Sequence, residues 1–393
     1  MSFLSIPLRS HLLSKFVTLL RPMLYLGVAM VLVTGVSWQI LLSRRPERVD
    51  LQRPLFRGVS YQRIVRELPR PLIFHVITID LNDPGLHFLV TAPDDKPDTN
   101  AKTEPKAIAN TESTSPLDAE PRSDARSSVK NSKTYDTLAR TTEQFLRETG
   151  VQVAINGSFY FPYHCESPWD YYPHAGDSVS ILGESVYRGK RYSVPNRFRP
   201  VLCFFKERPP EVHNMLAPPD SYYAIACANL LMRDGKFIPK RETNDREFAP
   251  RTAVAMDKAR ETMWLLVVDG RQAGYSEGVT LKELSDFAVD LGADVVVNMD
   301  GGGSSTLVID SGTGPQVLNA PFHPNVPMWQ RPVGNHLGLF AAPLERVTKT
   351  CAPVSSMPFS SMKPRNDSEN RGRMSVSATC NGETLTAASI GQR

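Results

Sequence analysis

The stretch Asn298-Met299-Asp300-Gly301-Gly302-Gly303-Ser304-Ser305-Thr306 lies between two apolar runs, at residues 293–297 and 307–309. Three consecutive glycines cost conformational entropy on folding, whereas a simple hairpin needs only an Asp-Gly pair. The surplus predicts backbone that approaches a ligand closely, with N–H groups facing an anion or a sugar oxygen. A loose turn is the alternative interpretation of this local string.

Two segments repeat one order of elements: a helix, a glycine, a buried strand and then an Asn-Gly or Asp-Gly pair. The first runs through a helix at residues 135–149 to Asn156-Gly157, and the second through a helix at residues 281–291 to Asp300-Gly301. Thr280 and Glu283 have the spacing of a capping box before the second helix.

The second helix also follows a strand, at residues 262–268, which ends in Asp269-Gly270-Arg271. A strand–helix–strand crossover normally makes its two strands parallel, and ligands of such sheets bind at the carboxyl ends of the strands. We therefore expect Asp269 and Asp300 at one edge of a sheet. Asn156 joins them if its own strand is parallel as well.

The charge of the chain is unevenly distributed. Its formal net charge is +4, but residues 1–57 hold eight of the 45 Lys/Arg and two of the 41 Asp/Glu. The remainder is slightly acidic, so the composition gives no case for a nucleic-acid partner.

Residues 23–42 form a run of 20 without a charge, which is long enough to cross a membrane. We interpret it as a transmembrane signal anchor that follows a cytoplasmic segment (residues 1–22) and precedes a linker (residues 43–71). Basic residues flank both ends, so their count does not orient the helix. We expect a membrane-anchored protein with its main domain extracytoplasmic, that is, periplasmic or extracellular. A buried core helix is the alternative.

The remaining pattern predicts one large α+β domain at residues 72–342, with a mixed β-sheet core flanked by helices. Strands are expected at residues 73–81 and 87–90, paired with each other across a turn. Residues 92–133 contain five prolines and no aromatic residue, and are expected to be a disordered insertion. A disordered Ser/Thr/Pro-rich tail is expected at residues 343–393.

The segment at residues 161–179 is rich in aromatic side chains, among them Phe161, Tyr163, Trp169, Tyr171 and Tyr172. Such a loop stacks on sugar faces in some proteins and packs as a lid over the core in others. Trp and Tyr suit both roles, so the two interpretations stay open.

Several motifs of known chemistry are missing. The five cysteines form no CxxC pair, residues 183–190 lack the spacing of a phosphate loop, and Ser304 is not followed by the glycine of a nucleophile elbow. Arg251, before an apolar strand, has the planar fork that suits phosphate or carboxylate, although a surface ion pair is the commoner outcome.

Six blocks occur together in the order seen in one family of enzymes. They are Asn156-Gly157-Ser158-Phe159-Tyr160, Arg251-Thr252-Ala253-Val254, Asp269-Gly270-Arg271, residues 278–284, Asp300 to Thr306, and Gly334-Asn335-His336. Over residues 72–342 the chain resembles the phosphodiester glycosidase domain family. The aromatic run and the membrane anchor resemble bacterial members of that family.

The resemblance implies hydrolysis of a sugar-1-phosphodiester in the cell envelope, which releases free sugar and a phosphomonoester. Asp300 and Asp269 would stabilise the oxocarbenium charge, and His336 would donate a proton. Substrate-binding residues would be Asn156, Arg251, Arg271, Gly301, Gly302, Gly303, Ser304, Ser305 and Asn335, with the N–H groups of the loop cradling the phosphate. No metal or other cofactor is implied.

Two other classes of function remain open. The domain would be a non-catalytic binder of envelope polysaccharide if the aromatic loop is its platform. It would be a structural domain if its acids bind a divalent cation, in which case metal would raise the melting temperature.

Overall fold

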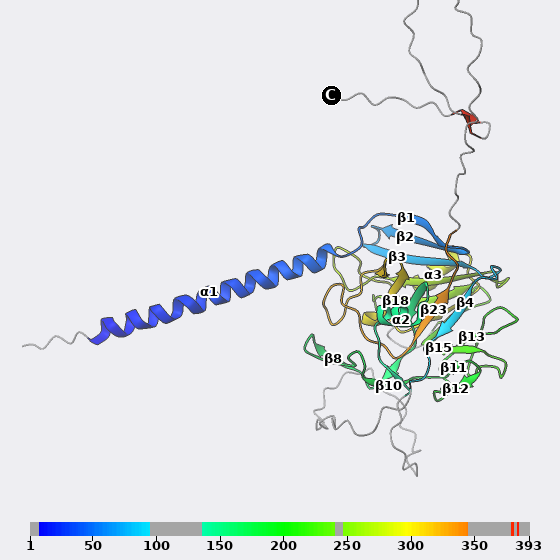
Figure 1. Ribbon diagram of the computed structural model, residues 1–393, viewed down its shortest axis with the longest axis horizontal. Coiled ribbons are helices and arrows are strands. Elements are labelled where there is room, and N and C mark those ends of the chain that lie inside the picture. Colours follow the sequence, from blue (N-terminus) through cyan, green and yellow to red (C-terminus); the bar gives the residue numbers. More distant parts are fainter. Residues whose placement is uncertain (1–7, 95–135, 240–246, 345–378, 381–382, 385–393) are drawn as a thin grey trace, which may run out of the picture. The chain divides into compact units, whose positions relative to one another are not determined.

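The computed structural model describes residues 8–94, 136–239, 247–344, 379–380 and 383–384 (Figure 1). The chain divides into two units, residues 1–345 and 346–393. In the second unit, β24 (Thr379–Cys380) and β25 (Glu383–Thr384) pair antiparallel. The predicted insertion at residues 92–133 and the predicted tail at residues 343–393 lie almost entirely outside the described residues.

The first unit is built mainly from strands in three larger sheets. The eight-stranded sheet has the order β1 (Leu51–Phe56), β2 (Val59–Arg66), β3 (Leu72–Asp80), β19 (Thr262–Val268), β18 (Arg251–Met256), β20 (Val295–Asn298), β16 (Asn229–Arg233) and β17 (Lys236–Phe237). The second sheet has the order β22 (Pro315–Val317), β21 (Leu307–Asp310), β6 (Val153–Asn156), β23 (His336–Phe340) and β4 (His87–Val90). The third has the order β12 (Lys190–Arg191), β11 (Ser185–Tyr187), β15 (Tyr223–Ala226), β13 (Val201–Phe204) and β14 (Glu211–His213).

Two smaller groups of strands lie in the aromatic part of the chain. One is a three-stranded sheet with the order β5 (Thr137–Leu138), β10 (Ser178–Ile181) and β7 (Tyr160–Phe161). The other is a hairpin of β8 (His164–Ser167) and β9 (Asp170–Tyr172).

Neighbouring strands among those named above pair antiparallel, which corrects the prediction of a mixed sheet. β19 and β20 nevertheless run in the same direction, because each pairs antiparallel with β18, which lies between them. Their carboxyl ends therefore share one edge of the sheet with the start of β18. This confirms the predicted direction, although the two strands are not neighbours.

The main core lies between the sheets. Apolar side chains of the eight-stranded sheet, such as Ile77 and Val254, pack in one cluster with Ile155 and Leu337 of the second sheet. The other face of the eight-stranded sheet is covered by α3 (Leu281–Asp290), and that of the second sheet by α2 (Thr142–Thr149). The predicted flanking helices are therefore present in a domain dominated by strands.

The caps of the two helices come from local sequence. Thr280 and Glu283 form the predicted capping box of α3. α2 begins at Thr142, later than the predicted start at residue 135. Thr141 is its N-cap, because the Thr141 hydroxyl accepts a hydrogen bond from the backbone N–H of Gln144. Residues 137–138 instead form β5 and pair with β10.

Two other sequence predictions were wrong. Residues 51–66, assigned to the linker, form β1 and β2. Val59 and Tyr61 of β2 are buried in the core, but the next buried position holds Arg63, which interrupts the apolar alternation in the sequence. β4 pairs with β23 of the second sheet and not with β3. The turn after β3 therefore passes from one sheet to the other.

The N-terminal helix α1 (Leu8–Ser43) contains the predicted anchor. Its segment Met23–Ser43 is long and apolar enough to cross a membrane, and the side chains of this segment are not buried in the protein. This agrees with a membrane anchor, by length and composition.

We expect Thr280→Ala to lower the free energy of unfolding by about 1 kcal/mol, because the first turn of α3 loses the oxygen that accepts the Glu283 N–H. Urea unfolding followed by circular dichroism measures the loss. Thr280→Ser, which keeps the hydroxyl, is the control and should remain close to the wild type. Equal losses in both variants would show that the cap oxygen is not the cause.

Candidate active site

A cavity of about 270 Å³ lies at the edge where β19 and β20 end and β18 begins. It is lined by Phe159, Tyr160, Tyr163, Glu247, Ala249, Arg251, Arg271, Asn298, Asp300, Gly301, Gly302 and Arg331. Of the predicted site residues, Asp300, Arg251, Arg271, Gly301 and Gly302 therefore come together at one place. A carboxylate and several guanidinium groups share this cavity.

Asp300 is the buried acid of the cavity, with only 6% of its surface exposed. Burial raises the pKa of its carboxyl group, against the opposing effects of Arg331 and of a hydrogen bond from Ser304. The Ser304 hydroxyl donates that bond to Asp300 Oδ2 over 2.5 Å. A desolvated carboxyl in a cavity has the character of a reacting group.

Arg331 supports this acid from the side of the aromatic segment. Its guanidinium donates to Ser304 Oγ (3.2 Å), to Tyr163 Oη (2.8 Å) and to Nδ1 of His323 (3.2 Å). Burial and the charge of Arg331 lower the pKa of His323 to about 3. His323 is therefore neutral near pH 7, so its Nδ1 can accept the bond from Arg331.

Arg251 and Arg271 form a second, cationic side of the cavity. Arg271 donates to Oε1 of Glu247 (2.8 Å), and Arg251 donates to the backbone carbonyls of Glu247 (2.8 Å) and Val279 (3.2 Å). These bonds orient both guanidinium groups at the cavity wall. An anionic group of a ligand would meet them there.

Three amides of the glycine loop make hydrogen bonds within the fold. Those of Gly302 and Ser305 donate to the carbonyls of Pro250 and Gly302, and that of Ser304 donates to the carbonyl of Gly301. A Cβ on Gly303 would lie 2.7 Å from the Arg331 guanidinium and 2.9 Å from His323 Nδ1. Glycine is needed there because Arg331 and His323 approach the backbone closely.

Asn156 and Asn335, predicted to bind substrate, are buried and hold the loops instead. The Asn156 amide donates to the carbonyl of Asp300 (2.7 Å), and its Oδ1 accepts from Thr252 Oγ1 (2.8 Å) and the N–H of Thr306 (3.2 Å). Asn335 bonds both the N–H and the hydroxyl of Ser158. These side chains position the site without facing the cavity.

Asp269, predicted to be a catalytic acid, lies behind the cavity wall and does not line it. Its fully buried carboxylate accepts bonds from Asn319 Nδ2 (3.1 Å) and the N–H of Ala320 (2.8 Å), and lies 3.0 Å from His75 Nε2. Tyr61 Oη contacts the other nitrogen of His75 at 2.8 Å. Asp269 thus belongs to an internal network that ties β2, β3 and the loop at residue 320 together.

His336, predicted to be a proton donor, is also away from the cavity. It is buried against Phe145 of α2, with ring centroids 4.7 Å apart. Burial, chiefly, lowers its pKa to about 3, so near neutral pH it is the neutral imidazole and not the imidazolium that a proton donor requires. Ser305 is likewise buried and does not line the cavity.

Sequence reasoning did not assign a role in the site to Arg331, His323, Glu247, Phe159 or Tyr160. Arg331 and His323 lie in a long loop without hydrophobic periodicity between β22 and β23, so no local pattern marks them. Phe159 and Tyr160 did have a signal, because they belong to the same block as Asn156-Gly157, one residue further along the chain. Among the described residues, no three His, Cys, Asp or Glu side chains are grouped so as to hold a metal ion.

The sequence model of the phosphodiester glycosidase family matches residues 149–340. The match covers just under half of the chain. The matched range includes Asp300, Arg251, Arg271 and Arg331, which line the cavity. A search of curated proteins gave no match.

Three solved structures resemble the chain at low identity. A hypothetical protein from Synechocystis is 14% identical with a TM-score of 0.48, and the match covers 75% of this chain and 64% of that one. The zebrafish N-acetylglucosamine-1-phosphodiester alpha-N-acetylglucosaminidase catalytic domain, auto-inhibited by its pro-peptide, is 17% identical with a TM-score of 0.43, covering 75% of this chain and 84% of that one. A putative exported protein from Burkholderia pseudomallei is 14% identical with a TM-score of 0.45, covering 69% and 74%. The chain thus spans just under two thirds of the Synechocystis protein.

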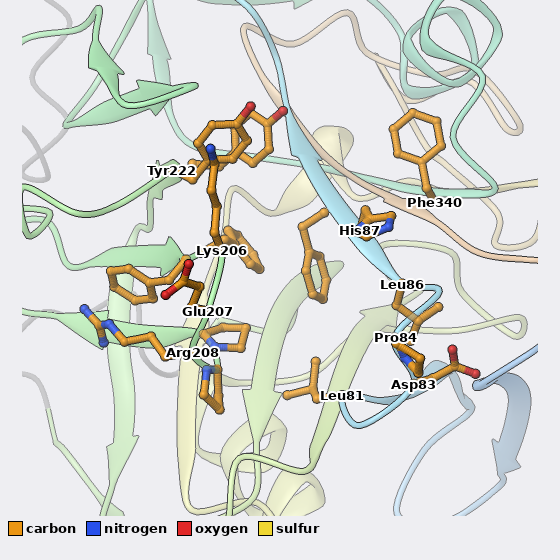
Figure 2. A pocket seen from close by; sticks show the side chains of 16 residues that line it. Leu81, Asp83, Pro84, Leu86, His87, Lys206, Glu207, Arg208, Tyr222 and Phe340 are labelled. Carbon is orange, nitrogen blue, oxygen red and sulfur yellow. The ribbon is translucent and has the colours of Figure 1, made fainter.

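The domain also has a larger cavity, of about 720 Å³, at a separate place (Figure 2). Its walls are mostly apolar and aromatic, and include Leu81, Leu86 and Phe340. Two of its charged side chains form ion pairs with neighbouring residues: Asp83 with Arg57, and Arg208 with Asp220. It therefore lacks the buried acid and facing arginines that distinguish the smaller cavity.

We expect Asn156→Ala to lower the free energy of unfolding by at least about 3 kcal/mol, because it leaves buried groups of Asp300, Thr252 and Thr306 without this partner. Thermal and urea unfolding of the full chain measure the loss. Gln316→Ala, at an exposed position of the same sheet, is the control and should change stability little. A loss as small as that of the control would contradict the bridging role of Asn156.

We expect Asp300→Asn to be more stable than the wild type at pH 7.5. The raised pKa means that ionisation of Asp300 opposes folding above that pKa and has no effect below the ordinary value near 3.9. The advantage of the variant should therefore shrink as the pH falls through the raised pKa towards 4 and be absent below 4, which melting curves at several pH values would show. Asp286→Asn, at an exposed position of α3, is the control; a constant difference across pH would refute the burial effect.

Proposed function

We propose that the domain hydrolyses a sugar-1-phosphodiester in the cell envelope and releases the free sugar and a phosphomonoester. The observation that carries this proposal is the buried acid Asp300 in one cavity with Arg251 and Arg271. Such a pair of charges suits a reaction in which a sugar becomes cationic while an anionic group departs. The match to the phosphodiester glycosidase family supports the same reaction class.

The cationic side would hold the phosphodiester. Its single negative charge would lie against Arg251 and Arg271, which are already oriented by their bonds to Glu247. Charge on the leaving phosphate increases as its bond to the sugar breaks, so these interactions strengthen in the transition state. That is the condition under which binding accelerates a reaction.

Asp300 would face the anomeric carbon. In its ionised form it would stabilise the positive charge that develops on the sugar. The bond between the anomeric carbon and the phosphate oxygen breaks, and water supplies the hydroxyl group that replaces it. The proton of that water passes to solvent or to the phosphomonoester. Asp269 has no part in this scheme, because it does not line the cavity.

The apolar part of α1 supports attachment to a membrane. We propose that the domain lies on the extracytoplasmic side. The substrate would then be an envelope component that carries a glycosyl phosphodiester. A non-catalytic polysaccharide binder is the second candidate, favoured by the exposed aromatic residue Trp169. Turnover distinguishes the two.

The test uses the full chain in detergent with p-nitrophenyl phosphodiesters of N-acetylglucosamine, glucose and mannose. Free sugar is measured by chromatography. We expect the wild type to turn over at least one substrate. Asp300→Asn should lower kcat/KM by about a hundredfold or more, and Arg251→Ala by about tenfold or more, because the phosphate loses a charged partner.

The control is Lys206→Ala, which removes an exposed cation at the larger cavity and should leave the rate unchanged. Folding of each variant is checked by its melting curve. Wild-type protein that is folded but releases no sugar from any of the three substrates would contradict the proposal. Equal activity in Asp300→Asn would remove that residue from the mechanism.

A further inference from the structure

One aromatic side chain near the active site is almost fully exposed. Trp169, at the turn of the β8–β9 hairpin, has 91% of its surface accessible. Tryptophan is usually buried to a large extent in folded proteins. An exposed indole on an ordered element commonly marks a contact surface, because it offers a large rigid area at a low entropy cost.

The hairpin that carries Trp169 is stabilised by contacts within itself and with the rest of the domain. His164 Nε2 contacts Asp170 Oδ1 across the hairpin at 3.1 Å, and the Tyr172 hydroxyl donates to the carbonyl of Ser178 at 2.7 Å. Tyr171 packs edge-on against His323, with ring centroids 5.1 Å apart. The exposed indole is thus held at a defined position.

The hairpin is also connected to the active site. His323, on which Tyr171 packs, accepts a hydrogen bond from Arg331, and Arg331 bonds Ser304 beside Asp300. Tyr163, the residue before β8, lines the cavity and lies under the Arg331 guanidinium, 4.6 Å from the ring centroid. The hairpin that carries Trp169 therefore directly follows a residue of the cavity lining.

The two sides of the cavity differ in chemistry. Gly302 lies beside Arg271, since a Cβ there would be 3.1 Å from that guanidinium, and Gly301 lies beside Arg251. The cavity is also lined by the aromatic residues Phe159, Tyr160 and Tyr163. Arginines suit a phosphate and aromatic rings suit the faces of sugar rings. The sugar would therefore occupy the side that continues into the hairpin.

We infer that the β8–β9 hairpin binds further sugar units of the glycone, so that the substrate is an oligosaccharide or polysaccharide joined through its reducing-end anomeric carbon to a phosphodiester. Trp169 stacks on a sugar ring beyond the cavity, and the exposed carboxylates of Glu166 and Asp170 accept bonds from its hydroxyls. This inference rests on the proposed function and names its substrate class. It predicts that a longer glycone binds better than a single sugar.

The test compares two substrates with the same p-nitrophenyl phosphate group, one carrying a single N-acetylglucosamine and the other a chain of four. For the full-length wild type in detergent, we expect KM to be about tenfold lower for the longer substrate, which is an ordinary contribution for one well-placed aromatic contact. Trp169→Leu should lose this advantage and keep the wild-type kcat on the short substrate. Trp169→Phe, which keeps an aromatic ring, should retain most of it.

Titration calorimetry with the free tetrasaccharide separates this inference from the proposed reaction. Suppose that Trp169→Leu weakens saccharide binding about tenfold and neither substrate is turned over. This result would support the saccharide platform, that is, sugar binding by the β8–β9 hairpin, and would contradict the proposed hydrolysis. Turnover with equal KM for both substrates in wild type and Trp169→Leu would overturn the platform and leave the hydrolysis standing. Loss of saccharide binding in Leu68→Ala, an exposed apolar control, would show a non-specific effect and count against the platform.

A membrane contact is the competing use of an exposed indole. In vesicles of phosphatidylglycerol and brominated phosphatidylcholine, bromine quenches tryptophans that enter the lipid. We expect the wild type and Trp169→Phe to lose the same amount of fluorescence on addition of brominated lipid. A smaller loss in Trp169→Phe would place Trp169 in the bilayer and overturn the saccharide platform.

Discussion

The side-chain amide of Asn156 is the interaction on which the site depends. It comes from the end of β6 and bonds the carbonyl of Asp300 and the hydroxyl of Thr252 at the eight-stranded sheet, and the N–H of Thr306 just before β21 of its own sheet. A buried amide satisfies its own hydrogen bonds only when all three partners are in place. The packing of the two sheets and the path of the glycine loop therefore depend on the same side chain.

That path creates an unusual electrostatic environment. Asp300 is buried at the end of β20, which disfavours its charge, yet Ser304 and Arg331 offer it partial compensation. If Asp300 paired fully with Arg331, the two would form an inert ion pair. If Asp300 had no partner, it would be a neutral acid. The intermediate situation exists because Gly303 has no side chain to keep Arg331 away.

The two aspartates that follow strands show how environment separates similar motifs. Asp269-Gly270 and Asp300-Gly301 end strands of the same direction at one sheet edge. Asp269 is enclosed by Asn319 and Ala320, which lie some fifty positions later in the chain, and becomes part of the internal framework. Asp300 keeps access to the cavity. The distinction arises from a distant loop and leaves no trace in the local pattern.

The sequence alone determined what depends on neighbours along the chain: the capping box of α3, the bounds of β19, and the common direction of β19 and β20. Connection rules, which are local, also predicted Asp269 and Asp300 at one edge of the sheet, whereas Arg251 and Arg271 were assigned to the site through the family resemblance. Only the tertiary structure decided that residues 51–66 complete the large sheet, that Asp269 and His336 are enclosed, and that Arg331, His323 and Tyr163 reach Asp300. The physical reason is that burial and long loop closures depend on side chains far apart in sequence, whose contacts exist only once the sheets have packed.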